Sequence, residues 1–320
     1  MLKITLRIAI ALALLSPLSP ATSALSAAGP PAQFELPSDH RPGVPSVPRV
    51  WLDRDGEPYP FQTDEEAMEL LATADVVGTK QLGIGVTRSE RLDLEADGLR
   101  FRAIFKTFHD IRQRVRLGDG TFVMHLRDTY RNEAAAYELG RHLGIDWIPP
   151  TIIRRIGGRE GSLQLWIENA IMEMDRRDRG LAHPDPELWR RKLSDMRVFD
   201  NLINNIDRNL GDMLITPEWH LWLVDHSRAF GRERHLPTPQ AISRCSVQLY
   251  EAIQALDQET AREILSPYMG RFEIRSLLQR RDAILEMLDE RIVEVGREHV
   301  LFDWETPAPV IEATPEEVAN

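Results

Sequence analysis

The chain has 320 residues, of which 42% are hydrophobic and 28% charged, and both values are ordinary for a soluble globular protein. Its formal net charge of −11 argues against nucleic acid as the main partner, because lysine and arginine drive binding to phosphate backbones. With Cys245 as its one cysteine, the chain cannot form an internal disulfide, and this thiol is expected to be a small buried apolar group.

The first 28 residues have the pattern of a secretory signal peptide. Lys3 and Arg7 provide a basic start, an apolar run of eight residues follows, and small residues then offer cleavage positions ending at Ala24 or Ala28. The apolar run is too short to span a bilayer. The sequence therefore predicts a secreted or periplasmic protein without a stable membrane span.

Residues 29–63 are expected to form a proline-rich linker or an extended surface arm. Six prolines lie between positions 30 and 48 with few apolar residues among them, and this composition favours extended chain over regular structure. Regular patterning begins at Asp64, where the sequence DEEAMELL is typical of a short capped helix.

A β-hairpin is expected close to residue 100. Its strands span residues 91–95 and 99–108, and Ala96-Asp97-Gly98 supplies the turn signal between them. Because successive side chains of a strand point to opposite faces, Lys106 shares a face with Ile104 rather than with the neighbouring phenylalanines.

A helix is expected from about Tyr130 to Leu143, followed by strands at residues 151–156 and 162–167. Glu133 lies in the first turn of this helix, whereas Glu138 points to roughly the opposite side. Glu133 is therefore the preferred acidic partner for the lysine at the end of the earlier strand, and Glu138 is the second choice. Taken alone, each of these charges is typical of a solvated surface.

The stretch from Asn204 to Gly231 places three aspartates around a short hairpin with strands at residues 213–215 and 221–224. A helix with apolar residues at helical spacing leads into it. Two carboxylates about 5 Å apart repel by roughly 3 kcal/mol at an effective dielectric near 20. Converging carboxylates therefore predict a cation between them, and a divalent metal holding phosphate oxygens is the favoured occupant.

Each polar residue of this stretch also has a structural interpretation. Asp207 could cap the preceding helix or pair with Arg208, or it could accept the proton of an attacking hydroxyl. Asn209 could form a turn or bind the metal, and Asp212 would bind it from the far end of the loop. Asp225 follows an apolar run, so its carboxylate needs a partner.

These features, taken in order, resemble the protein-kinase-like superfamily, and in particular its atypical branches. These branches include the phosphatidylinositol 3-/4-kinases and the secretory-pathway kinases that phosphorylate casein-like proteins or xylose. They carry an aspartate-arginine catalytic loop and a D-N-G or D-F-G metal motif, where this chain has Asp207-Arg208 and Asp225-His226-Ser227. The bacterial HipA-type kinases share an F-x-x-L-I-x-N-x-D pattern, which is matched here by Phe199, Leu202, Ile203, Asn205 and Asp207.

The resemblance extends over about residues 83–295 and implies an α+β, two-lobed protein-kinase-like fold. A small β-rich N-lobe would span residues 64–168, and a larger, mostly helical C-lobe with the catalytic hairpin would span residues 169–303. The acidic tail, residues 304–320, is expected to be disordered. ATP and Mg²⁺ or Mn²⁺ would be the cofactors.

The resemblance also implies a role for individual residues. Lys106 would contact the phosphates, Glu133 would be its ion-pair partner, and Asp207 would be the catalytic base. The metal ligands would be Asp212 and Asp225, with Asn209 as a further candidate. The remaining nucleotide contacts would come from the glycine loop and from the backbone of the adenine-binding hinge, namely Gly83, Gly85, Leu165, Trp166 and Ile167.

The sequence therefore predicts a secreted kinase-like phosphotransferase that moves the γ-phosphate of ATP to a hydroxyl on a protein, a glycan or a lipid. Two alternatives stay open. The same fold could belong to a nucleotide-binding pseudokinase or a nucleotidyl transferase, or the chain could be a non-enzymatic secreted interaction module whose acidic hairpin binds a structural metal. The histidines show no zinc spacing, and no Gly-x-Ser-x-Gly elbow is present.

Overall fold

The computed structural model describes residues 50–82, 89–116 and 122–304, all of which belong to one compact unit. The predicted signal peptide, most of the proline-rich arm, Gly83 and Gly85 of the glycine loop, and residues 305–320 of the predicted tail lie outside these ranges. Within the described ranges, no helix combines the length and apolar character that a bilayer crossing requires.

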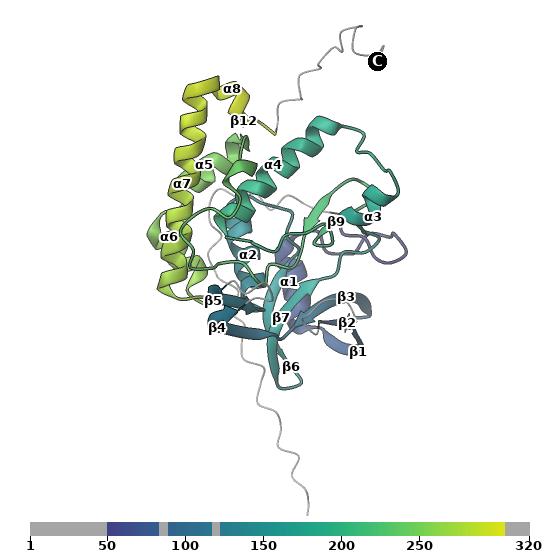
Figure 1. Ribbon diagram of the computed structural model, residues 1–320. Helices are drawn as coiled ribbons and strands as arrows, with labels where there is room; N and C mark the ends of the chain where they lie inside the picture. Colours follow the sequence, from purple (N-terminus) through teal and green to yellow (C-terminus); the bar gives the residue numbers. More distant parts are fainter. Residues whose placement is uncertain (1–49, 83–88, 117–121, 305–320) are drawn as a thin grey trace, which may run out of the picture. The chain divides into compact units, whose positions relative to one another are not determined.

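A five-stranded antiparallel sheet forms the core of the N-lobe, with the strand order β1-β2-β3-β7-β6 (Figure 1). Its strands are β1 (Asp75–Gln81), β2 (Glu90–Ala96), β3 (Leu99–Lys106), β6 (Thr151–Ile156) and β7 (Arg159–Leu165). Side chains of β3 alternate as predicted, with Phe101, Ala103 and Phe105 buried and Ile104 only partly so. This alternation sets Lys106 on the Ile104 side of the strand.

Close approach of β7 to β3 depends on Gly161. A Cβ at this position would meet the carbonyl oxygen of Lys106 and would lie 2.7 Å from the Phe105 ring. The absence of a side chain therefore allows β7 to pair with β3 beside Lys106, where Ser162 is its register partner.

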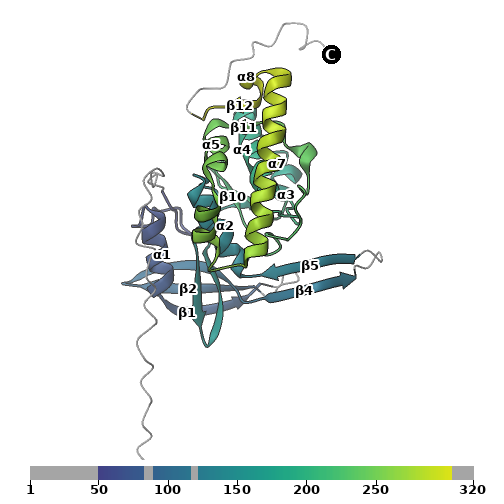
Figure 2. The same ribbon diagram turned by 90° about the vertical axis from the view of Figure 1, so that its left-hand side faces the viewer.

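Two helices and a second β-hairpin complete the N-lobe. They are α1 (Asp64–Thr73), α2 (Arg131–His142), β4 (His109–Arg116) and β5 (Phe122–Thr129). The short capped helix that was expected from Asp64 is α1, and Thr63 and Glu66 form a capping box at its start. The sequence interpretation continued β3 to Phe108 and did not predict the β4–β5 hairpin, which extends beyond the five-stranded sheet in Figure 2.

Helices predominate in the C-lobe. They are α3 (Glu173–Asp178), α4 (Pro186–Leu202), α5 (Val247–Ala255), α6 (Gln258–Leu265), α7 (Arg271–Val295) and α8 (Arg297–Val300), with a short 3₁₀ helix at Pro239–Ala241. Two small sheets accompany them, one with the order β10-β9-β8 and one pairing β11 with β12. Their strands are β8 (Ile171–Met172), β9 (Met213–Ile215), β10 (Leu221–Leu223), β11 (Cys245–Ser246) and β12 (Leu301–Phe302).

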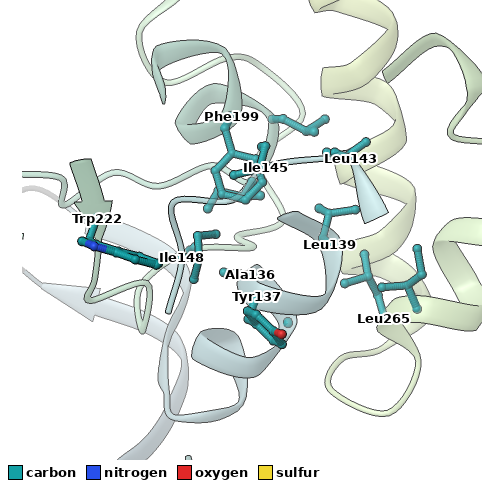
Figure 3. Packing of buried hydrophobic residues seen from close by; sticks show 14 of the residues in the cluster. Ala136, Tyr137, Leu139, Leu143, Ile145, Ile148, Phe199, Trp222 and Leu265 are labelled. Atoms are coloured by element: carbon teal, nitrogen blue, oxygen red, sulfur yellow. The ribbon is translucent and has the colours of Figure 1, made fainter. Parts of the chain in front are cut away.

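One hydrophobic core joins the two lobes through α2. Figure 3 shows Leu139 of α2 close to Leu265 of α6, with Tyr137 of α2, Phe199 of α4 and Trp222 of β10 in the same cluster. Because α2 is buried between the sheet and the C-lobe helices, the first turn of this helix has a fixed position relative to the β9–β10 hairpin. Cys245 is buried as predicted, and burial raises the pKa of its thiol, which argues against a nucleophile.

Candidate functional site

Lys106 lies at the end of β3 between two carboxylates. Its Nζ donates to Glu133 Oε1 at 2.6 Å and to Asp225 Oδ1 at 2.9 Å. The Lys106 and Glu133 side chains are only 8% and 2% exposed. Burial opposes the charge on both groups, but their mutual attraction prevails, so the pKa of Lys106 is raised and the pKa of Glu133 is lowered. Both groups are therefore ionised at neutral pH.

Glu133 also reaches the segment that follows Asp225. Its second oxygen, Oε2, accepts a hydrogen bond from the backbone N–H of His226 at 2.9 Å. Of the two acids that the sequence offered as partners of Lys106, the structure therefore selects Glu133. Glu138 acts elsewhere. The pKa of Tyr268 in the C-lobe is raised first by the burial of that tyrosine and second by the negative charge of Glu138.

Asp225 occupies a sharp turn two residues after the end of β10. Its φ of +59° is in the left-handed region, which aspartate and asparagine tolerate better than other residues that carry a side chain. This backbone conformation directs the carboxylate to Lys106 and the next N–H to Glu133. Such strained positions are enriched at functional sites.

Asp212 lies near Asp225 at the base of the β9–β10 hairpin. The N–H of Val224 donates to the Asp212 carbonyl oxygen at 3.0 Å, which joins the two ends of the hairpin. Burial, followed by the charge of Asp225, raises the pKa of the Asp212 carboxyl to about 7. The two carboxylates therefore interact electrostatically, as the sequence predicts.

Asn209 forms the loop that holds Asp212. Its side-chain N–H₂ donates to Asp212 Oδ2 at 2.6 Å, and its backbone N–H donates to the same oxygen at 3.2 Å. The Asn209 amide oxygen accepts from the Gly211 N–H at 2.8 Å. Its turn-forming role is thus observed directly, and its hydrogen bonds orient the carboxylate of Asp212.

Arg208 connects this loop to the turn at Asp225. Its guanidinium donates to Asp200 at 3.1 Å and to the Val224 carbonyl oxygen at 2.7 Å, so it pairs with Asp200 rather than with Asp207. Arg208 Nη2 lies 2.9 Å from Nε2 of His226. Since arginine only donates, this histidine nitrogen is the acceptor and the ring proton is on Nδ1, on the side of Glu133.

Asp207 lies on the other side of the loop and is half-exposed. Its Oδ2 accepts from Arg228 Nη1 at 2.9 Å, and Arg228 Nε donates to Asp128 Oδ2, also at 2.9 Å. The sequence predicted neither Arg228 nor Asp128 as a site residue, and it did not predict the partners of Arg208. The available signal was the position of Arg228 three residues after Asp225, but no local pattern indicates the distant acid on β5.

The acidic residues of the hairpin suit a hard divalent cation. Among the described residues, no three histidine, cysteine, aspartate or glutamate side chains converge as a ready-made metal site. Asp212 and Asp225 nevertheless form a pair of carboxylates whose repulsion a cation would relieve. Mg²⁺ typically uses one or two protein carboxylates and completes its shell with water and phosphate oxygens, so these donors fit such an ion.

The predicted hinge begins at Leu165, the last residue of β7. The N–H of Leu165 donates to the Pro150 carbonyl oxygen at 2.9 Å, and the N–H of Trp166 donates to the Arg102 carbonyl oxygen at 3.0 Å. Ile167 is half-buried and packs against the core. Two backbone N–H groups of the segment are thus used within the N-lobe, which fixes the path of the chain where it leaves the sheet.

Comparison with known proteins identifies the fold. The chain matches no protein-family model and no curated protein sequence. Among solved structures, it is similar to a hydra Fam20 protein solved with a sugar, with a TM-score of 0.57 and 16% identity over 76% of this chain and 93% of that one. It is also similar to a Golgi casein kinase, with a TM-score of 0.54 and 15% identity over 74% of this chain and 77% of that one.

A further structure of the Golgi casein kinase, solved with Mn and ADP bound, has a TM-score of 0.54 and 16% identity over 74% of this chain and 78% of that one. The predicted architecture is therefore confirmed. The chain has a two-lobed protein-kinase-like fold, with a small β-rich N-lobe and a larger, mostly helical C-lobe.

Proposed function

We propose that the protein is a secreted kinase-like phosphotransferase that moves the γ-phosphoryl group of ATP to a hydroxyl acceptor with the help of Mg²⁺ or Mn²⁺. The observation that carries this proposal is the position of Lys106, whose Nζ contacts both Glu133 and Asp225. A buried lysine held by an acid from a helix and by an acid after a strand is the arrangement that phosphoryl transfer in this fold uses.

In the proposed reaction, the chain's own residues bind and orient. Lys106 contacts the nucleotide phosphates and is kept in place by Glu133. Asp212 and Asp225 hold the metal, and Asn209 orients Asp212. A bound divalent ion would neutralise charge on the phosphate oxygens. Asp207 accepts the proton of the attacking hydroxyl or orients that hydroxyl.

Gly83, Gly85 and the hinge at Leu165–Ile167 are proposed to contact the nucleotide as well. The Golgi casein kinase that was solved with Mn and ADP supports nucleotide and metal use by this fold. Its name and that of the sugar-bound hydra protein agree with an acceptor that is a protein or a glycan, and with a protein that enters the secretory pathway.

Incubating the secreted protein with γ-labelled ATP, Mg²⁺ or Mn²⁺, and casein, xylosides or phosphoinositide vesicles tests this proposal. We expect label to be transferred to one acceptor class and not to the others. Intact-protein mass spectrometry distinguishes phosphoryl transfer from adenylyl transfer, because the two additions differ in mass. Stabilisation by Ca²⁺ alone, with no effect of nucleotide on thermal unfolding, would instead support a non-enzymatic metal-binding module.

A further inference from the structure

Arg228 connects two elements that are far apart in the sequence. Its Nε donates to Asp128 at the end of β5, and its Nη1 donates to Asp207 in the loop after α4, each at 2.9 Å. The Asp128 side chain is buried, whereas Arg228 and Asp207 are 33% and 50% exposed. The three side chains form a bridge from Asp128 through Arg228 to Asp207. Its Asp128 end is fixed in the N-lobe, and its Asp207 end is the proposed catalytic base.

The backbone around Arg228 is also held in place. The Asn132 side chain donates to the carbonyl oxygens of Ser227 and Ala229, at 2.7 and 2.8 Å, and the Thr129 N–H donates to the Ser227 carbonyl oxygen at 3.0 Å. The residues on both sides of Arg228 are therefore bound to the start of α2. A guanidinium attached to such a backbone has little freedom beyond its own side-chain torsions.

Arg228 is positively charged and is surrounded by acids. Its hydrogen bond to Asp128, followed by the charges of Asp207 and Asp225, raises the pKa of the guanidinium. In the part of the chain that the structure describes, Oδ2 of Asp207 accepts from a side chain and Oδ1 does not. Oδ2 of the proposed base is thus held by Arg228, and Oδ1 stays available to the hydroxyl group of the substrate that receives the phosphate.

We propose that Arg228 is a positioning residue for Asp207. It holds Oδ2 so that Oδ1 meets the proton of the acceptor hydroxyl, and it sets the distance between the base and the N-lobe through Asp128. This inference rests on the proposed function, in which Asp207 is the base. It requires arginine rather than lysine, because Asp128 and Asp207 are bound by two different nitrogens on separate edges of the planar guanidinium, whereas lysine has a single nitrogen.

Steady-state kinetics of the secreted protein test the proposal with Arg228→Gln, Arg228→Lys and Asp128→Asn. Arg244→Gln is the matched control, because Arg244 has a similar exposure of 31% and donates to Glu187 at 2.8 Å, away from the site. We expect kcat to fall about 10-fold to 100-fold in the two Arg228 variants and to fall in Asp128→Asn, with the KM for ATP changed by less than about twofold. Arg244→Gln should keep the wild-type kcat.

Hydrogen exchange gives a second measurement that does not depend on activity. In Arg228→Gln, the amides of residues 205–212 should exchange faster than in the wild type, while those of α7 should not change. Unaltered exchange in residues 205–212 would overturn the proposal, and so would an equal loss of kcat in Arg244→Gln. If the wild type transfers no phosphate, the proposed function fails, but the exchange measurement still decides whether Arg228 positions the loop.

Discussion

Lys106 and Glu133 form an ion pair in which Nζ lies 2.6 Å from Oε1 and both side chains are almost fully buried. Two isolated charges would be costly at such a depth. Two further hydrogen bonds offset the cost of burying these charges. Asp225 also accepts from Lys106, and the His226 N–H donates to the second oxygen of Glu133. The N-lobe strand, the helix and the C-lobe turn are thereby joined through four polar groups.

Replacing Glu133 by glutamine tests how much this pair stabilises the fold. We expect the free energy of unfolding to fall by about 3 kcal/mol, because a buried lysine loses one of its two charged partners. Glu69→Gln on α1, the other helix of the N-lobe, is the control because Glu69 is solvent-exposed, and it should change the free energy by less than about 0.5 kcal/mol. Urea unfolding measures both variants. Equal losses would mean that the buried contact contributes no more than an ordinary surface charge.

Elements with a clear period or turn signal could be predicted from the sequence. The alternation in β3 predicted the face of Lys106, and helical spacing predicted the approach to Asp207 along α4. The β4–β5 hairpin was missed because its strand HDIRQRVR carries charges at most alternate positions and resembles surface loop. The signal that could have revealed it is Asp119-Gly120, a pair that favours tight turns.

Contacts between distant residues could be predicted only in part. The resemblance predicted the pair of Lys106 and Glu133, because each residue belongs to a motif with a known place in the fold. The bridge from Asp128 through Arg228 to Asp207 spans 100 residues of sequence on one side and 21 on the other, and no local pattern indicates it. Such a pairing follows from how β5 and the loop meet in three dimensions.

Asp225→Asn tests the proposed metal site without disturbing its backbone. Asparagine tolerates the left-handed conformation at φ +59°, whereas alanine would add strain. We expect phosphoryl transfer to fall about 100-fold or more, which corresponds to about 3 kcal/mol of lost charge stabilisation. The additional thermal stabilisation that Mg²⁺ or Mn²⁺ gives with ATP should also disappear.

Glu218→Gln, in the turn between β9 and β10, is the control for removing one acidic charge from the same hairpin, and it should leave both measurements unchanged. Differential scanning fluorimetry with ATP, with metal, and with both separates the contributions. Full metal-dependent stabilisation in Asp225→Asn would exclude this carboxylate as a ligand.

Gly161→Ala tests the approach of β7 to β3. The new Cβ would meet the Lys106 carbonyl oxygen and the Phe105 ring, neither of which can move freely, so we expect a loss of about 1–3 kcal/mol. Gly78→Ala in the same sheet is the control, because the atom nearest to its Cβ would be Oδ2 at the movable end of the Asp93 side chain rather than a backbone atom. Denaturant unfolding should therefore separate the two variants, and a smaller loss for Gly161→Ala would contradict the packing argument.

Asp195 on α4 is expected to make stability depend on pH. Its carboxylate is buried and accepts from the Ser246 N–H at 2.7 Å and from the Trp304 indole N–H at 3.1 Å. Burial prevails over these hydrogen bonds and raises the pKa from 3.8 to about 6. Below pH 3.8 the Asp195 carboxyl is protonated in both the folded and the unfolded chain. Between 3.8 and about 6 the unfolded chain releases the proton first, so rising pH favours unfolding.

The wild type should therefore lose about 3 kcal/mol of unfolding free energy relative to Asp195→Asn as the pH rises from 3.8 to about 6, and no more above that. Urea unfolding of both proteins between pH 4 and about pH 7 measures this difference. Asparagine cannot titrate, so Asp195→Asn serves as the reference for the wild type. The contributions of all other ionisable groups are the same in both proteins and cancel in the difference. Parallel curves for the two proteins would mean that Asp195 titrates at its ordinary value, and that its hydrogen bonds to Ser246 and Trp304 compensate fully for burial.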